Sequence, residues 1–355
     1  MADTICSSPL VSPQRIEAFI SRAFEAVSVP RDDAKIIASV LVRADLGSAV
    51  YSQGVARLPQ YIRRIKGGAV NPKPNIRIER EAPGMALING DNGMGQLVMH
   101  FAAQKAIEKA KTAGVAWIGV RWSNHAGPAS LYVSMLMAHD MVGLCFAVGS
   151  SNHMPPLGGI DMLFGANPIA IGVPAGKEPA VLLDMSATVA GYGKVRNKAQ
   201  RGEMMPEGWM VDREGKPLTD PRRAHEGFLV PIGGYKGYGL VLMSGLLAGT
   251  LNGAAMGRDV VDFLTDDTTP TNTGQVIVAI SLSAFGDVAD FKHRVDALVR
   301  DIRGSRRLPG VDAIRLPGEQ RHARLSKRTR LGIPMPEPLL KSLNQLAIDL
   351  GITGL

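Results

Sequence analysis

Cysteine is nearly absent from this sequence, and its scarcity excludes whole classes of protein. The 355 residues include only Cys6 and Cys145, which is too few for a disulfide framework or a cysteine-based zinc site. The seven histidines include no pair four residues apart and none with a cysteine at metal-ligand spacing, so no metal site is expected. Cys145 lies in an apolar run and is predicted to be a small buried hydrophobe.

Nucleotide-binding and hydrolase motifs are missing as well. The chain has no Gly-x-Gly-x-x-Gly, the usual fingerprint of a dinucleotide fold, and no Gly-x-x-x-x-Gly-Lys-Ser/Thr phosphate loop. It also lacks Gly-x-Ser-x-Gly, which carries the nucleophile of many hydrolases. Any chemistry must therefore come from other polar positions.

Neither a targeting segment nor a membrane span is expected. The first residues lack a basic stretch that leads into an apolar one, so we predict no signal peptide and a cytoplasmic protein. The uncharged run 237–257 contains six glycines, and its apolar density is below that of a spanning helix. We expect a buried helix of a globular protein there.

Positive charge is concentrated near the C-terminus. The net charge is +8, and residues 291–330 hold twelve Lys or Arg against four Asp or Glu. This basic stretch has no interleaved aromatic residues and no zinc-finger spacing, so nucleic acid is not an expected partner. A solvated face, or a face that recruits an anionic cofactor or substrate, is the better interpretation.

The chain is long enough for two or three structural units. Residues 1–83 are predicted to be helical, because Ser12-Pro13 is a helix start that precedes apolar residues at helical spacing. Residues 84–300 alternate strands with helices, and residues 301–355 form a basic, helical C-terminal part. The predicted fold class is α/β with an added helical layer.

The α/β part contains short apolar strands separated by helices around 102–110 and 129–139. The stretch 115–120 is continuously apolar, which is typical of a strand buried on both faces. The predicted strands are 85–88, 115–120, 142–148, 169–173 and 180–183.

Polar residues follow three of these strands. Ser123-Asn124-His125 comes after the strand over 115–120, Ser150 follows the next strand, and Asp184-Met185-Ser186 ends a later one. Ligands bind at the carboxyl ends of strands in open α/β sheets, and a histidine there can move a proton near neutral pH. A set of capped surface loops is the alternative for each segment taken alone.

Three further segments carry groups suited to anions. The turn Gly233–Gly239 contains Tyr235 and Lys236, and its glycines allow a close backbone approach to a ligand. Arg57 lies between two helical segments, and arginine can grip a carboxylate with two hydrogen bonds, although on a solvated helix it would be unremarkable. Residues 315–319 form a turn that ends in Gly318-Glu319, which is a structural loop in the alternative interpretation.

Taken together, these segments resemble the malate/L-lactate dehydrogenase family of the non-Rossmann type. That family includes ureidoglycolate and sulfolactate dehydrogenases, 2,3-diketo-L-gulonate reductase and cyclic imino-acid reductases. The similarity runs from residue 12 to about residue 335, and six matching segments in family order make it specific. They are Tyr51–Arg57, Ser123–His125, Gly165–Pro168, Leu183–Met185, Gly234–Gly237 and Leu316–Glu319.

The resemblance implies a fold, a cofactor and a set of residue roles. It implies that NAD or NADP binds to a non-Rossmann α/β domain over 84–300, while the terminal parts 1–83 and 301–355 form an added helical domain. A small carboxylate substrate and a homodimer or higher homo-oligomer are expected. In this family His125 corresponds to a proton-transfer residue and Arg57 to a ligand of the substrate carboxylate. The expected cofactor-binding residues are His125, Ser150, Asp184, Met185, Ser186, Tyr235, Lys236, Gly318 and Glu319.

One position departs from the pattern of the family. Its first segment usually reads Ser-His-Gly-Val, but here Gln53 stands at the histidine position. Glutamine can hydrogen-bond a substrate oxygen but cannot transfer a proton, so we expect His125 to handle the proton alone. A different substrate and weak activity are the two alternatives that Gln53 leaves open.

The expected activity is reversible hydride transfer between nicotinamide and a small 2-hydroxy or 2-oxo acid of the malate or lactate type. In this hypothesis Arg57 orients the carboxylate, His125 moves the proton and Gln53 hydrogen-bonds the same oxygen. A reductase of piperideine- or pyrroline-2-carboxylate is one alternative. A catalytically weak binding protein on the same fold is another.

Overall fold

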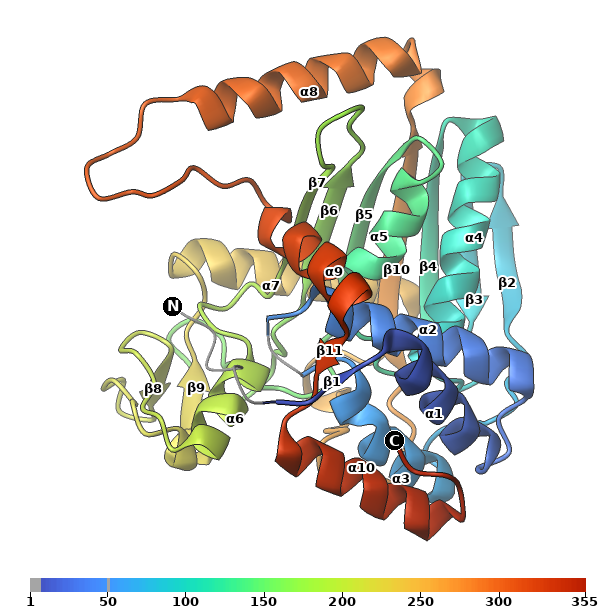
Figure 1. The fold of residues 1–355 in the computed structure, drawn as a ribbon, viewed down its shortest axis with the longest axis vertical. Coiled ribbons are helices and arrows are strands. Elements are labelled where there is room, and N and C mark those ends of the chain that lie inside the picture. Colours follow the sequence, from blue (N-terminus) through green and yellow to red (C-terminus); the bar gives the residue numbers. More distant parts are fainter. Residues whose placement is uncertain (1–7, 50–51) are drawn as a thin grey trace.

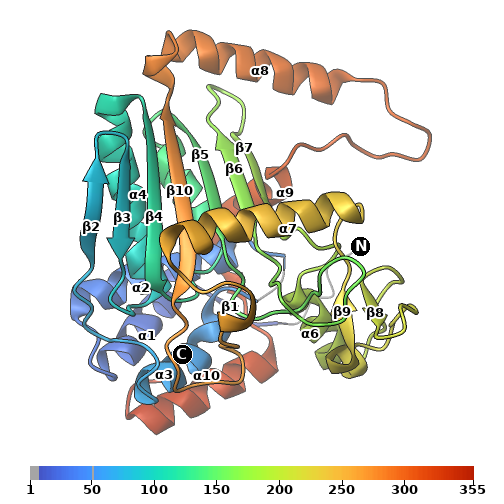
Figure 2. The ribbon, with the colours of Figure 1, turned by 180° about the vertical axis from the view of Figure 1, so that it is seen from behind.

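The structure is a computed structural model that describes residues 8–49 and 52–355. Cys6 and Tyr51 lie outside the described residues. A seven-stranded sheet runs through the middle of the molecule, with helices on both faces (Figures 1 and 2). Helices from both ends of the chain gather at one end of the strands, so the sheet meets a helical layer there.

The large sheet is mixed, with the strand order β2-β3-β4-β10-β5-β6-β7. Among the described strands only β3 and β4 pair in parallel, and the other neighbouring pairs are antiparallel. The predicted α/β class is confirmed in this mixed form. The strands are β2 (Arg77–Ala82), β3 (Met85–Asn89), β4 (Val115–Ser123), β5 (Met141–Ala147), β6 (Ile169–Val173), β7 (Val181–Met185) and β10 (Thr273–Ser281).

Two strands of the large sheet were not expected from the sequence: one is β2, which lies in the part predicted to be helical, and the other is β10. β10 lies between β4 and β5 and pairs with both, although it follows them by more than a hundred residues. Two short strand pairs lie outside the large sheet. They are β1 (Leu10–Val11) with β11 (Ile333–Pro334), and β8 (Met210–Asp212) with β9 (Gly227–Leu229).

Helices cover the sheet and form the layer at its end. α4 and α5 pack on one face of the sheet, and α7 crosses the other face (Figures 1 and 2). The helices are α1 (Pro13–Glu25), α2 (Arg31–Gly47), α3 (Leu58–Lys66), α4 (Gly95–Ala113), α5 (Ser130–Met137), α6 (Tyr192–Arg201), α7 (Tyr235–Ala248), α8 (Val288–Gly304), α9 (Glu319–Leu331) and α10 (Glu337–Leu350).

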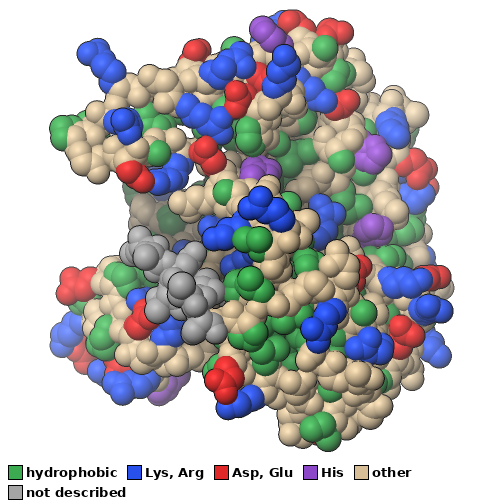
Figure 3. All heavy atoms as spheres, viewed as in Figure 1, with side chains coloured by type: hydrophobic (Ala, Val, Ile, Leu, Met, Phe, Trp, Pro, Cys, Tyr) green, Lys and Arg blue, Asp and Glu red, His purple; other side chains and the backbone are tan. Residues whose placement is uncertain are grey.

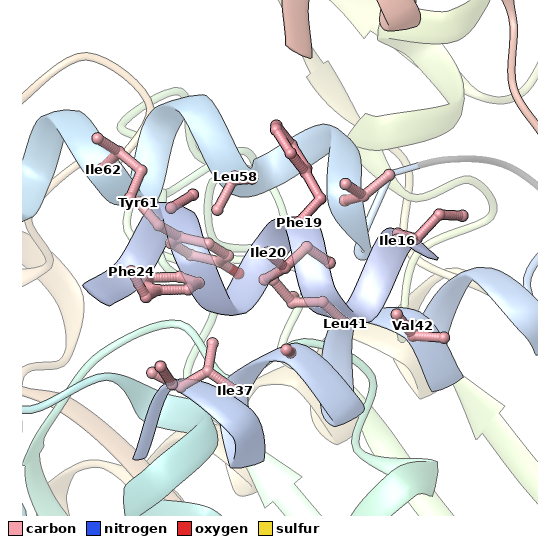
Figure 4. Close-up of a cluster of buried hydrophobic side chains, with 14 of the residues drawn as sticks. Ile16, Phe19, Ile20, Phe24, Ile37, Leu41, Val42, Leu58, Tyr61 and Ile62 are labelled. Carbon is pink, nitrogen blue, oxygen red and sulfur yellow. The ribbon is translucent and has the colours of Figure 1, made fainter. Parts of the chain in front are cut away.

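The helical layer consists of α1, α2, α3 and α10 and has its own buried core. Ser12 caps α1 by accepting a hydrogen bond from the Arg15 N–H at 3.3 Å, and Pro13 begins the helix as predicted. Apolar residues of the first 70 positions pack against residues after 333. Figure 4 shows side chains of α1, α2 and α3 meeting in this core, with Tyr61 of α3 among them.

The uncharged run 237–257 differs from the expectation of a buried helix. Its α-helical part is all of α7 after the first two residues, and this helix buries only one side, through residues such as Gly237 and Val241. Gly237, Val241 and Gly245 are buried, whereas Leu240, Met243 and Leu246 face outward. Among the described residues, no helix is long and apolar enough to cross a membrane.

α8 projects from the body of the molecule as an arm, and an extended segment returns from it to α9 (Figures 1 and 2). Residue 300 lies inside α8, which continues to Gly304. The arm is held by Asp296, whose carboxylate accepts hydrogen bonds from the backbone N–H groups of Gly176, Lys177 and Glu178 at 2.7–3.1 Å.

The predicted burial of Cys145, in β5, is confirmed.

Asp45, near the end of α2, fixes the segment that carries Gln53 and Arg57. Its carboxylate is fully buried and accepts a hydrogen bond from the Val55 N–H at 2.8 Å. A Cβ atom on Gly54 would lie only 2.1 Å from the Asp45 Oδ1 atom, so this close approach requires glycine. The segment is thus anchored to the helical layer by one buried acid.

We expect Gly54→Ala to lower the free energy of unfolding by about 1–3 kcal/mol, because the added methyl group displaces the Asp45 carboxylate and leaves the Val55 N–H unsatisfied. Urea denaturation measures this change. Gly239→Ala is the matched control, because a Cβ atom there meets nothing within 4 Å and alanine favours a helix. Equal stability of the two variants would contradict the anchoring role of Asp45.

Candidate active site

A cleft of about 990 Å³ lies where the sheet meets the helical layer. The strands β4, β5 and β7 run in the same direction, because each is antiparallel to β10 or β6. Their carboxyl ends therefore meet at one edge of the sheet, and the polar residues that follow them converge in the cleft. This geometry explains why segments far apart in the sequence form one site.

Most of the predicted site residues are brought together, but three are not. Glu319 accepts hydrogen bonds from Arg303 Nη2 and from the Leu316 N–H, both at 3.0 Å, and does not line the cleft. Tyr235 and Lys236 begin α7, are exposed, and do not line it either. The predicted residues that do line the cleft are Gln53, Arg57, His125, Ser150, Asp184, Met185, Ser186 and Gly318.

His125 is held between the helical layer and the sheet. Its Nδ1 atom lies 2.6 Å from the Tyr61 hydroxyl oxygen, and its ring stacks on Phe263 with centroids 4.9 Å apart. Burial, assisted by the positive charge of Arg57, lowers the pKa of His125 to about 3. The ring is therefore neutral near pH 7 in the free protein.

The hydrogen bonds of Tyr61 determine which nitrogen of His125 carries the proton. The Gln96 Nε2 atom donates to the Tyr61 hydroxyl oxygen at 3.2 Å, and an amide nitrogen cannot accept a hydrogen bond. The Tyr61 hydroxyl then has its own proton to donate to Nδ1 of His125. The proton of the neutral ring sits on Nε2, which is the nitrogen left for a ligand.

Arg57 is positioned by three contacts that leave part of its guanidinium available. Nε donates to the Ser52 carbonyl oxygen at 2.8 Å, Nη1 donates to Gln60 Oε1 at 2.9 Å, and the group lies 5.4 Å from the centre of the Phe263 ring. One N–H group on Nη1 and two on Nη2 remain at the end of the guanidinium, and these can donate to a carboxylate. Burial lowers the pKa of Arg57, so an anion that replaces the lost water is favoured.

Two amide oxygens in the cleft wall are buried without a hydrogen-bond partner among the described residues. These are Oε1 of Gln53 and Oε1 of Gln275. Buried acceptors of this kind require an N–H or O–H donor, which a ligand or an ordered water can supply. The carboxamide and ribose hydroxyls of a nicotinamide dinucleotide offer such donors, and the cleft volume is sufficient for one.

Asp184 and His153 also belong to the polar lining of the cleft. The Asp184 carboxylate accepts hydrogen bonds from the Ser130 hydroxyl and from its N–H, and burial raises its pKa. The His153 ring stacks on Tyr192 with centroids 4.0 Å apart, and burial lowers its pKa to about 4. His153 is therefore also neutral near pH 7.

Sequence analysis missed Tyr61, Gln96 and Phe263. Tyr61 lies four residues after Arg57, a spacing that places both on one side of a helix, so this residue was within reach of a pattern argument. Gln96 and Phe263 reach the site from α4 and from a distant loop. Nothing in their local sequence indicates that position.

We expect the His125 ring to stay neutral, with its proton on Nε2, between pH 8 and pH 5. Because its pKa is lowered in the folded state, only the unfolded state gains this proton, and the free energy of unfolding falls as the pH drops below about 6.5. Nitrogen-15 NMR of labelled histidine reports both the charge and the tautomer. A titration midpoint near pH 6.5 would contradict the buried, Tyr61-bound state.

Comparison with known proteins agrees with this arrangement. The family model described as malate/L-lactate dehydrogenase matches residues 11–344. A malate/(S)-sulfolactate dehydrogenase of Methanothermus fervidus is 38% identical and the match covers 97% of this chain and 98% of that protein. The structure of a malate dehydrogenase from Pyrococcus horikoshii superposes with a TM-score of 0.90 at 34% identity, covering 100% of this chain and 99% of that one.

Two other relatives are named with their cofactors. A ureidoglycolate dehydrogenase (NAD(+)) of Escherichia coli strain K12 is 29% identical, with 94% of each chain covered. A (2R)-3-sulfolactate dehydrogenase (NADP(+)) of Chromohalobacter salexigens is 30% identical over 96% of this chain and 99% of that protein. The family model and the relatives cover nearly the whole chain, so this protein belongs to the malate/L-lactate dehydrogenase family.

Proposed function

We propose that this protein is an NAD- or NADP-dependent dehydrogenase that interconverts a small 2-hydroxy acid and its 2-oxo acid. The observation that carries the proposal is the arrangement of Arg57 and His125 on the same Phe263 ring in a dinucleotide-sized cleft. The arginine that would bind a carboxylate therefore lies next to the histidine that would transfer a proton. Malate and sulfolactate type substrates are the first candidates, because relatives with these names match nearly the whole chain.

The cofactor is proposed to bind along the sheet edge, without a Rossmann fold. The sheet is mixed, whereas a Rossmann sheet is parallel. Ser150, Met185 and Ser186 would contact the cofactor from the strand ends, and Gln275 Oε1 would accept a hydrogen bond from it. When bound, the nicotinamide supplies or accepts the hydride.

Arg57 is proposed to set the orientation of the substrate. A carboxylate bound to the N–H groups at the end of its guanidinium would place the neighbouring C2 atom and its oxygen beside the His125 ring. Fixing such a geometry lowers a reaction barrier by roughly 7–11 kcal/mol in favourable cases. The Gln60 and Phe263 contacts hold the guanidinium in place before substrate binds.

His125 is proposed to exchange the proton with the substrate oxygen. In reduction, Nε2 donates to the carbonyl oxygen and passes its proton there as the carbonyl becomes a hydroxyl. Because the charge of Arg57 is one cause of the lowered pKa, a carboxylate bound to Arg57 raises the pKa of His125. The ring can then take up on Nδ1 the proton that reduction consumes, with the Tyr61 hydroxyl oxygen turning to accept from it. Nε2 gives its own proton to the substrate oxygen, and the ring returns to the neutral form.

Two copies of the chain are proposed to associate through α7. Leu240, Met243 and Leu246 form an exposed apolar strip on this helix, and such strips mark interfaces. The arm α8 leaves the body of the molecule and would contact a neighbouring copy (Figure 2). Light scattering of the purified protein, with Met243→Lys as the variant, tests this association.

The reaction itself is tested by following NADH and NADPH absorbance with oxaloacetate, sulfopyruvate, pyruvate and piperideine-2-carboxylate. Turnover of a 2-oxo acid supports the proposal. Turnover of the cyclic imine alone would favour the imino-acid reductase, and binding of cofactor without turnover of any acid would favour a binding protein.

We expect His125→Ala to lower kcat/KM by about 100-fold or more, the scale of a lost acid–base group. Gln53→Ala should cost less, about 1–3 kcal/mol, because only one hydrogen bond to the substrate oxygen is lost. Steady-state kinetics of both variants with the best 2-oxo acid make the comparison. The opposite ranking would assign the proton transfer to another group.

We expect Arg57→Lys to lower kcat/KM by about tenfold or more, because a point charge does not reproduce the two-pronged grip. Cofactor affinity should stay unchanged, which intrinsic NADH or NADPH fluorescence measures. Arg63→Lys is the control, since this neighbour on α3 is exposed and pairs with Asp267. Equal kinetics of the Arg57 and Arg63 variants would remove Arg57 from the substrate site.

A further inference from the structure

A separate region of the cleft wall is built from arginines of α9 and the end of α2. Arg321 and Arg324 line the cleft there, beside Gly47. The charges that act on Arg321 come from Asp184, Arg43 and Arg324, whereas those that act on Arg57 come from Tyr61 and Arg196. The two arginines therefore lie in different parts of the cleft. Figure 3 shows Lys and Arg side chains gathered over α9 on this face.

Arg321 packs directly on α2 at Gly47, where the absence of a side chain leaves room for the arginine. A Cβ atom on Gly47 would lie 2.9 Å from Cγ of Arg321 and 3.1 Å from Cζ, so the arginine lies directly against the glycine. Arg324, one turn further along α9, donates from Nε to the Gly47 carbonyl oxygen at 3.0 Å. Both guanidinium groups are thus positioned by the same residue.

The positive charge of this region exceeds the negative charge that faces it. Among the described residues Asp184 is the acid that acts on Arg321, and it already accepts two hydrogen bonds from Ser130. The nearby Glu319 is bound to Arg303. The Arg321 guanidinium makes no hydrogen bond within the part of the chain that the structure describes, so this half-buried cation keeps all its N–H donors for a ligand anion.

NAD and NADP differ in one charged group, and a region of positive charge can distinguish them by it. Both carry a pyrophosphate, but NADP adds a dianionic phosphate on the adenosine ribose. In Rossmann enzymes that select NAD a carboxylate binds the ribose hydroxyls, and in those that select NADP an arginine binds the ribose phosphate; the same charge complementarity applies in any fold. Here Arg321 is a cation that lines the cleft without a side-chain hydrogen bond among the described residues, and Oδ2 of the neighbouring Asp184 is held by two hydrogen bonds from Ser130.

We propose that Arg321, supported by Arg324, binds the ribose phosphate of NADP, and that this chain prefers NADP to NAD. The inference rests on the proposed function, because it assumes that the cleft holds a nicotinamide cofactor. Beyond the proposed function, which leaves NAD and NADP open, it names NADP as the preferred cofactor and Arg321 as the residue that selects it.

The test compares dissociation constants of NADPH and NADH for the full chain and for Arg321→Gln, using calorimetry. Loss of a charge-assisted contact predicts NADPH binding weaker by about 10- to 100-fold and NADH binding changed by less than about threefold. The fragments 2′,5′-ADP and 5′-AMP, which cannot react, should show the same contrast. Arg330→Gln removes one charge from the exposed end of the same helix and should change neither affinity.

Three results would overturn the inference. They are a preference of the unmodified chain for NADH, an equal loss of both cofactors in Arg321→Gln, which would assign the arginine to the pyrophosphate, and no loss of either. These results are independent of catalysis. A chain that selects 2′,5′-ADP through Arg321 but turns over no acid would keep this inference and overturn the proposed function.

Discussion

The hydrogen bond between the Tyr61 hydroxyl and Nδ1 of His125 is the contact on which the site depends. It joins the core of the helical layer to the end of β4, two parts of the molecule with separate buried cores. The bond requires α3 to be seated in its layer and β4 to be central in the sheet. When both conditions hold, the imidazole has one orientation, one tautomer and no charge.

Neutral His125 and charged Arg57 both contact the Phe263 ring, so the positive charge of Arg57 lies close to the imidazole. The arginine charge opposes a second positive charge on the imidazole until an anion arrives. A substrate carboxylate would relieve that opposition and prepare the proton for transfer. The separate group around Arg321 would do the same for a phosphate, so the whole cleft is built for a ligand with negative charge at two places.

Much of the fold and part of the site follow from the sequence, for identifiable reasons. Apolar periodicity predicted α1 and the central strand β4, and the family resemblance predicted Gln53, Arg57 and His125 in one cleft, where they are found. The position of β10 was missed because pairing with strands over a hundred residues earlier has no local signal. Tyr235, Lys236 and Glu319 do not line the cleft of this single chain, and the domain division, the oligomer and the cytoplasmic location stay predictions.

Deuteride transfer tests the central claim most directly, that this cleft brings a nicotinamide and a 2-oxo acid together beside His125. The protein is incubated with C4-deuterated NADPH and NADH and the best 2-oxo acid, and the product is analysed by NMR and mass spectrometry. The account predicts deuterium on C2 of a single enantiomer of the hydroxy acid, at a rate that His125→Ala lowers. Cofactor that binds tightly while no acid acquires deuterium would contradict it.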